Sequence, residues 1–192
     1  MPKSPKEMVE AIARNLPAKT GRTFEQWVAL TRKQKPASRA EAVAWLKSQH
    51  KLGTVTATFI AADATGQSIV DQYADEGKLL DAMYSGEKLS LRPVYDELTR
   101  AGRKLGKDVQ LTVCKTYVGL RRARMFALVK PSTKSRVDLG LALDGVNPSG
   151  RLAKAPSSIG NDRITHVIGI ASKREIDAEV RRWLKAAWEA AG

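Results

Sequence analysis

Cationic side chains gather in one short segment of the chain, residues 115–130. The segment contains five cations and a tyrosine: Lys115, Tyr117, Arg121, Arg122, Arg124 and Lys130. Arginine can bind a phosphate through two parallel hydrogen bonds, lysine acts as a point charge, and a tyrosine ring can stack on a nucleobase. These residue types therefore suit the binding of phosphate groups. A solvated edge hairpin, whose charges only discourage aggregation, explains the same residues equally well.

The alternation of residue types predicts two short strands for this segment, with a tight reversal near residues 122–124. In the first arm, Thr116, Val118 and Leu120 would share one face, and Lys115, Tyr117, Gly119 and Arg121 the other. In the second arm, Met125, Ala127 and Val129 would oppose Arg124, Phe126, Leu128 and Lys130. We therefore expect a hairpin with one apolar face and one partly cationic face.

His166 is the histidine of most interest. It lies in the apolar run 164–168, where we expect it on the same strand face as Ile164 and Ile168. A structural histidine held by a hydrogen bond is the simplest interpretation. Two alternatives stay open: a general base, or a residue that lines a pocket for an anionic ligand together with Lys115, Tyr117 and Arg121.

Catalytic and metal-binding patterns are scarce. The sequence contains no P-loop, dinucleotide fingerprint, nucleophile elbow or zinc spacing. Asp108 and Asp138 are the plausible sheet carboxylates, and neither has a neighbour that would complete the acidic cluster of a magnesium-dependent nuclease. The lone Cys114 excludes an internal disulfide and a cysteine-cluster metal site. We therefore predict a protein without catalysis, metal or cofactor.

The charge balance indicates the kind of partner. The 192 residues include 33 lysines and arginines against 20 acidic residues, a net charge of +13 with a pI near 10.0. Such a field favours polyanions such as DNA, RNA or the ribosome. The chain shows neither a secretory signal nor an apolar run long enough to span a membrane, which predicts a soluble, cytoplasmic protein.

Residues 1–62 are predicted to form a small basic domain of four short helices. Capping-box patterns at residues 23–26 and 38–41 open two of them, and Pro17 is expected to end the first. Cations in the loops and at the helix ends form a second candidate phosphate-binding set: Lys19, Arg22, Lys33, Lys35 and Arg39. A solvated helical face explains these cations equally well.

Residues 63–77 read as an acidic linker, followed by an α+β domain over residues 78–192. Ile69, Val70 and Tyr73 mark a brief helical face in the linker, which could mask a basic surface. In the second domain we expect a helix over 91–105 capped by Ser90, and strands near 108–114, 115–121, 124–130, 136–143 and 163–171. A capping box at 172–175 would open the terminal helix. The predicted fold class is therefore α+β: a small N-terminal helical domain plus a C-terminal antiparallel sheet flanked by helices.

Residues 18–27 (AKTGRTFEQW) and 42–53 (AVAWLKSQHKLG) resemble a short helical bacterial domain of unknown function. Residues 115–122 (KTYVGLRR), 137–143 (VDLGLAL) and 165–167 (THV) resemble a second uncharacterised bacterial domain that often follows the first. More loosely, the second half is similar to the YdhG and MmcQ/YjbR group of small α+β proteins, for some of which a double-wing DNA-binding role has been suggested. The resemblance implies no catalytic residues.

Three functional hypotheses follow. The leading hypothesis is a non-catalytic protein that binds DNA or structured or ribosomal RNA. Both basic domains would contact the phosphates, and no membrane partner is expected. The second is a sensor or enzyme for a small anionic ligand, with Lys115, Arg121 and His166 in its pocket. The third is a protein-interaction adaptor whose helical domain docks a partner.

Overall fold

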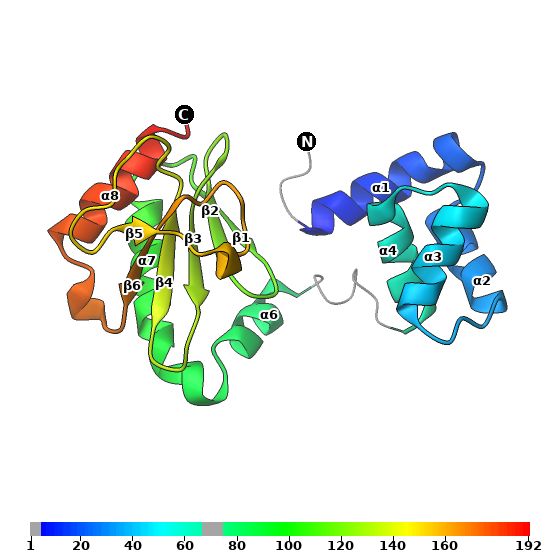
Figure 1. The fold of residues 1–192 in the computed structure, drawn as a ribbon, viewed down its shortest axis with the longest axis horizontal. Coiled ribbons are helices and arrows are strands. Elements are labelled where there is room, and N and C mark those ends of the chain that lie inside the picture. Colours follow the sequence, from blue (N-terminus) through cyan, green and yellow to red (C-terminus); the bar gives the residue numbers. More distant parts are fainter. Residues whose placement is uncertain (1–4, 67–74) are drawn as a thin grey trace. The chain divides into compact units, whose positions relative to one another are not determined.

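The computed structural model describes residues 5–66 and 75–192, and the chain divides into two compact units, Met1–Glu76 and Gly77–Gly192 (Figure 1). The first unit is helical, and the second holds a six-stranded antiparallel sheet with helices. Each unit has its own buried apolar cluster. The predicted α+β class is confirmed.

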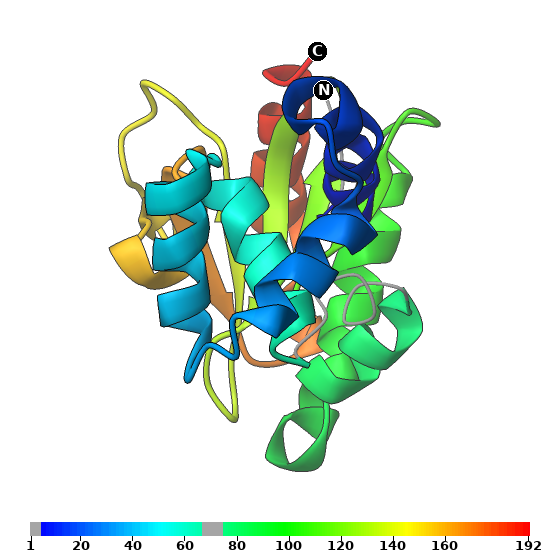
Figure 2. The same ribbon diagram turned by 90° about the vertical axis from the view of Figure 1, so that its right-hand side faces the viewer.

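Four helices build the described part of the first unit: α1 (Pro5–Thr20), α2 (Phe24–Lys33), α3 (Arg39–His50) and α4 (Thr54–Ala64). Helix α4 packs against both α2 and α3, and α1 contacts α2 (Figure 2). Trp27, Leu46 and Ile60 are buried at the centre of this small core. Its stability comes from the apolar stripes that these short helices turn towards one another.

The helix ends of the first unit follow the sequence signals in part. The capping box of α2 is complete, since Thr23 Oγ1 accepts from Gln26 N (3.2 Å) and Gln26 Oε1 accepts from Thr23 N (2.9 Å). Pro17, however, does not end α1, which continues to Thr20. Pro17 is exposed and lies in the last turn of α1. The helix loses only the hydrogen bond that the N–H of this residue would have made, and it ends soon afterwards, where Gly21 adopts a left-handed backbone (φ 72°).

The second unit begins with helices and ends with one. Its elements are α6 (Glu76–Met83), the 3₁₀ helix η1 (Gly86–Leu91), α7 (Arg92–Arg103), β1 (Gln110–Val113), β2 (Val118–Arg121), β3 (Met125–Pro131), β4 (Val137–Leu141), β5 (Ala153–Lys154), η2 (Ser157–Ile159), β6 (His166–Ile170), η3 (Lys173–Glu175) and α8 (Ala178–Glu189). Both ends of the predicted linker are helical, because α4 extends to Ala64 and α6 starts at Glu76. The rest of that prediction, including Ile69, Val70 and Tyr73, lies outside the described residues.

Two predicted helix starts differ from the structure, the first by one residue and the second by several. Ser90 lies inside η1, and α7 follows with Pro93 in its first turn. The terminal capping box at 172–175 encloses the short helix η3, whereas α8 begins after Asp177, whose Oδ1 accepts from Val180 N (3.2 Å). In both places a short 3₁₀ helix precedes the α-helix.

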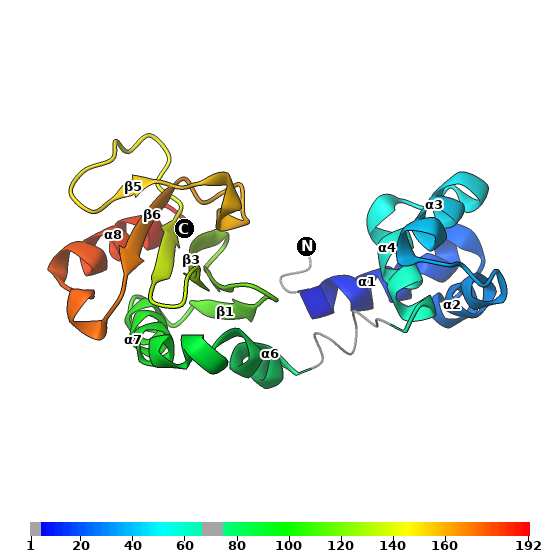
Figure 3. The same cartoon turned by 60° about the horizontal axis from the view of Figure 1, so that its bottom comes forward.

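The strands follow the order β1-β2-β3-β4-β6-β5, and each neighbouring pair is antiparallel. Helices α7 and α8 cover one face, where Leu98 and Leu184 belong to the same core cluster as Leu139. The segment that carries β5 and η2 covers the other face, where Ile159 packs with Leu128. Figure 3 shows α7 and the β5 segment on opposite sides of the sheet. The short strand β5 was not predicted from the sequence.

The β2–β3 hairpin forms with the predicted reversal, in which Arg122 N donates to Arg124 O (2.9 Å). A β-bulge shifts the register between Leu120 and Arg121, so Arg121 pairs with Met125 and leaves Phe126 as the extra residue. As a result Phe126 joins the helix-side core, while Met125 lies over Gly119 on the other face. The faces predicted for Met125 and Phe126 are therefore exchanged.

Candidate anion-binding sites

The arginines at the tip of the β2–β3 hairpin bind other parts of their own unit. Arg122 Nε donates to Asp108 Oδ2 (2.6 Å), and its guanidinium lies 4.4 Å from the centre of the Trp188 ring. The hydrogen bond from Arg122 lowers the pKa of Asp108. Arg124 Nη2 donates to the carbonyl of Ala190, just beyond α8 (3.0 Å). These contacts fasten the hairpin tip to the end of α8.

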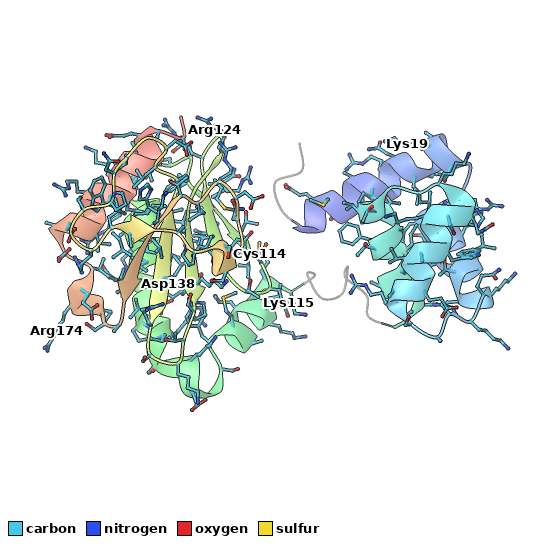
Figure 4. The ribbon with its side chains drawn as sticks, viewed as in Figure 1. Lys19, Cys114, Lys115, Arg124, Asp138 and Arg174 are labelled. Atoms are coloured by element: carbon cyan, nitrogen blue, oxygen red, sulfur yellow. The ribbon has the colours of Figure 1, made fainter. Side chains whose placement is uncertain are left out.

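The remaining hairpin residues of the predicted set lie apart. Strand β2 starts only at Val118, so Lys115 belongs to the β1–β2 turn, and Arg121 lies at the opposite end of the strand. Tyr117 packs against the apolar cluster that contains Leu128. In Figure 4, Lys115 lies beside α6, whereas Arg124 lies at the other end of the sheet. The sequence therefore grouped residues that the fold separates.

His166 does not join Lys115 and Arg121 in a pocket. It lies on β6, which β3 and β4 separate from β2, and its side chain is only 4% exposed. Its Nδ1 lies 2.9 Å from Thr165 Oγ1, the environment that we expected of a structural histidine. It shares the helix-side face with Ile168, but Ile164 packs on the opposite face, so that part of the prediction is wrong.

Lys115 instead lines a cleft of about 510 Å³ at the end of the sheet where the β1–β2 and β3–β4 turns meet α6 and η1. We call this site the lysine cleft, after its four lysines: Lys88, Lys115, Lys130 and Lys134. Its other lining residues are Ala82, Met83, Ser85, Glu87, Thr116, Pro131 and Ser132. Lys88 and Lys134 were not predicted as site residues, because they lie near turns that are far apart in the chain and nothing in the sequence links the two turns.

Most of the charge in the lysine cleft lacks a counter-ion. Lys134 Nζ pairs with Glu87 Oε1 at 2.7 Å. Lys88 Nζ donates to the carbonyl of Pro131 (2.7 Å), and Lys130 Nζ donates to the carbonyls of Ser158 and Ile159. Lys115 makes no side-chain hydrogen bond or ion pair with any residue that the structure describes. Among the residues that the structure describes, no carboxylate therefore neutralises three of the four ammonium groups.

A second cleft, of about 400 Å³, lies in the first unit between the α2–α3 loop and the end of α4. This α2–α3 cleft is lined by Arg32, Lys35, Pro36, Ala37, Ser38, Arg39, Ala64 and Thr65, and no acidic residue is among them. Arg32 Nη2 donates to the backbone carbonyl of Asp63 (2.9 Å), which holds the guanidinium at the rim. Lys35 has a left-handed backbone (φ 48°) that turns the chain towards α3.

The fold brings two of the five predicted cations of the first unit together, Lys35 and Arg39, and adds Arg32 to them. Lys19 lines a separate groove beside α4, and Arg22 lies 5.1 Å from the centre of the Trp27 ring. Lys33 is exposed at the end of α2. Arg32 was passed over because helix periodicity alone does not show which loop a side chain faces.

Arginines of the second unit form several further ion pairs. Arg151 bonds to Asp177 Oδ1 (2.6 Å) and Glu179 Oε2 (3.0 Å), and Arg181 bonds to Glu97 Oε1 (2.9 Å). The hydrogen bond from Arg151 lowers the pKa of Glu179, and that from Arg181 lowers the pKa of Glu97. These carboxylates are therefore committed to the fold and are poorly suited to proton transfer at neutral pH.

The part of the chain that the structure describes holds no group of three or more His, Cys, Asp or Glu residues arranged to bind a metal ion. Over the same residues, no helix combines the length and the apolar character needed to cross a membrane.

Comparison with family models covers both units. Residues 80–191 match the model described as Domain of unknown function (DUF5655). The chain belongs to the DUF5655 family. Residues 8–66 match the model described as Domain of unknown function (DUF4287), so the predicted pair of uncharacterised domains is confirmed. The lysine cleft lies in the DUF5655 part and the α2–α3 cleft in the DUF4287 part. Comparisons with curated proteins and with solved structures found no match. The looser similarity to the YdhG and MmcQ/YjbR group stays a prediction.

Proposed function

We propose that the protein binds nucleic acid, DNA or structured RNA, without catalysis, and that the first unit supplies the main contacts. The observation that supports this proposal is uncompensated charge. None of the nine cationic side chains between Arg14 and Lys51 forms an ion pair with a carboxylate that the structure describes. Three of them, Arg32, Lys35 and Arg39, line the same cleft.

Such a surface suits a phosphate backbone for two reasons. Each cation that neutralises a phosphate releases a condensed counter-ion, which supplies sequence-independent affinity. Guanidinium groups such as those of Arg32 and Arg39 can also grip a phosphate through two hydrogen bonds, while Lys35 adds a point charge. The hairpin contributes less than the sequence suggested, because Arg122 and Arg124 already bond within their unit. The adaptor hypothesis stays a prediction, since no observation here favours it.

A mobility-shift titration of the full chain against duplex DNA, single strands and structured RNA tests the proposal. The decisive variant carries Arg32→Gln, Lys35→Gln and Arg39→Gln. We expect it to weaken binding by about tenfold or more and to reduce the slope of log affinity against log salt by about three. The matched control carries Arg14→Gln, Lys47→Gln and Lys51→Gln, which removes the same charge outside the cleft and should weaken binding much less.

Two results would contradict the proposal. Absence of retention of any nucleic acid at low salt would exclude nucleic-acid binding. Equal losses in the two triple variants would show that the α2–α3 cleft is not the contact site and that the affinity reflects net charge alone.

A further inference from the structure

The lysine cleft brings together four ammonium groups from separate parts of the second unit. Lys88 comes from η1, Lys115 from the β1–β2 turn, Lys130 from the end of β3, and Lys134 from the β3–β4 turn. Like charges at close range repel each other, and a single carboxylate, Glu87, lines the site. A bound anion would relieve this repulsion.

Two of the ammonium groups are held in place without losing their charge. Lys88 donates to the carbonyl of Pro131, and Lys130 donates to the carbonyls of Ser158 and Ile159. A carbonyl is a neutral acceptor, and an ammonium group has three donors, so both lysines keep positive charge and Lys88 also keeps unused donors. Lys115 has all three donors unused by described residues. The cleft is therefore partly organised for an anion before the anion arrives.

The lining indicates the class of that anion. No aromatic ring and no arginine lines the cleft, so it offers neither a stacking platform for a base nor a planar fork for a carboxylate. Lysine point charges together with the hydroxyl groups of Ser85, Thr116 and Ser132 suit compact oxyanions of high charge. The volume of about 510 Å³ lies in the range of small-ligand sites and exceeds the needs of one phosphate.

We propose that the lysine cleft binds a small anion that carries two or more linked phosphate groups. This site belongs to the second unit, whereas the nucleic-acid surface proposed above belongs to the first. Glu87 has a specific part in it. Its carboxylate pairs with Lys134 at 2.7 Å and adds negative charge to the cleft, so it competes with the ligand for that ammonium group.

Isothermal titration of the full chain with inorganic tripolyphosphate, pyrophosphate and orthophosphate at moderate salt tests the proposal. We expect tripolyphosphate to bind about tenfold or more tightly than orthophosphate, because it can reach several ammonium groups at once. Lys115→Glu should weaken the binding of tripolyphosphate by about tenfold or more, since it reverses an unpaired charge in the cleft. Glu87→Gln should strengthen the binding of tripolyphosphate several-fold, because it removes the competing carboxylate.

Lys107→Glu is the matched control. Lys107 is exposed and precedes β1, whereas Lys115 follows it, so the same charge reversal at the other end of the strand should leave tripolyphosphate binding nearly unchanged. Both lysines are exposed and lack side-chain hydrogen bonds to described residues, so neither variant should unfold the unit.

Three results would overturn the proposal. The first is no measurable binding of tripolyphosphate at millimolar concentration. The second is equal weakening by Lys115→Glu and Lys107→Glu, which would indicate a general charge effect. The third is displacement of tripolyphosphate by duplex DNA together with loss of DNA binding in Lys115→Glu, which would make the cleft part of a polymer surface. The triple variant of the α2–α3 cleft should leave tripolyphosphate binding intact, so this proposal and the nucleic-acid proposal can fail separately.

Discussion

The two units of this chain are both rich in basic residues but use them differently. In the first unit, the cations between Arg14 and Lys51 make no ion pair with a described carboxylate. In the second, arginines such as Arg122, Arg151 and Arg181 bond to carboxylates of their own unit. A net charge of +13 is therefore not itself a binding site. What matters is which cations the fold leaves without an acidic partner.

The two units use their cations differently because their loops and connecting segments are held in place in different ways. The first unit joins short helices through short capped loops, and backbone hydrogen bonds and the Trp27 core suffice. The second unit must hold a long irregular segment, residues 144–165, over its sheet. Arg151 does so by bonding to the carbonyl of Glu175 in η3 and to the carboxylates of Asp177 and Glu179 at the start of α8. In the lysine cleft, by contrast, Lys88 and Lys130 bond to backbone carbonyls and Lys134 alone pairs with a described carboxylate.

Removal of the Arg151 network should have the largest effect on stability. Arg151→Met leaves Asp177 and Glu179 without this partner and frees the segment before β5, so we expect a clear fall in the urea midpoint of the second unit, larger than for the other substitutions below. Urea unfolding, followed separately at the Trp183 and Trp27 indole resonances, measures this loss for each unit. The first unit should be unaffected.

Arg174→Met is the control for Arg151. Arg174 is exposed on η3 and makes no side-chain hydrogen bond with described residues, so its removal should change stability by less than about 0.5 kcal/mol. Figure 4 shows its side chain directed away from the unit. If Arg151→Met and Arg174→Met changed the stability of the second unit equally, cations that bond to carboxylates would not contribute more to the fold than cations without such a partner.

Removal of Arg122 should have a smaller effect. Arg122→Met deletes one ion pair to Asp108 and the stacking on Trp188, both partly exposed, so we expect a smaller loss of stability than for Arg151→Met. Arg122→Lys should restore the charge but little of the stacking, because an ammonium group is not planar. Full rescue by lysine in a thermal melt would show that charge alone holds the hairpin tip.

Salt should have the smallest effect, and its sign should differ between the units. Raising the salt concentration screens repulsion among the unpaired cations of the first unit, so we expect a stabilisation of about 0.5 kcal/mol. In the second unit the same salt weakens attractive ion pairs such as that of Arg151 with Glu179, and this loss exceeds the relief of repulsion in the lysine cleft, so we expect a slight destabilisation. Hydrogen exchange of core amides in each unit measures both changes. Equal stabilisation of both units by salt would contradict the view that the cations of the first unit repel each other while those of the second are paired.

Much of the fold was predictable because it depends on local patterns. Helical spacing of apolar residues and the Thr23 capping box placed α2, and strand alternation placed the β2–β3 hairpin. The failures are also physical. The bulge at Phe126 leaves no trace in the alternation of apolar and polar residues, so the sequence does not reveal it. Pro17 does not end its helix, because α1 ends within one turn after it. Strand β5 is two residues long and exists through its pairing with β6.

The candidate sites were predictable only as residue types. The sequence marked Lys115, Lys35 and Arg39 as cations free to bind phosphate, and each of them lines a cleft. It also marked Arg122 and Arg124, which the fold uses internally. Nothing in the order of residues distinguishes these two groups, because the partners Asp108 and Ala190 are distant along the chain.

Most helical and strand segments, the excess of positive charge and the lack of recognisable catalytic motifs follow from the order of amino acids, because these properties depend on composition and on neighbours within a few residues. Which cations meet a carboxylate, and which meet each other, depends instead on how the elements pack in space. Lys88 and Lys134 come to line the same cleft because the β3–β4 turn folds back beside η1. Electrostatic interactions act through distance in space, and the chain order does not specify that distance.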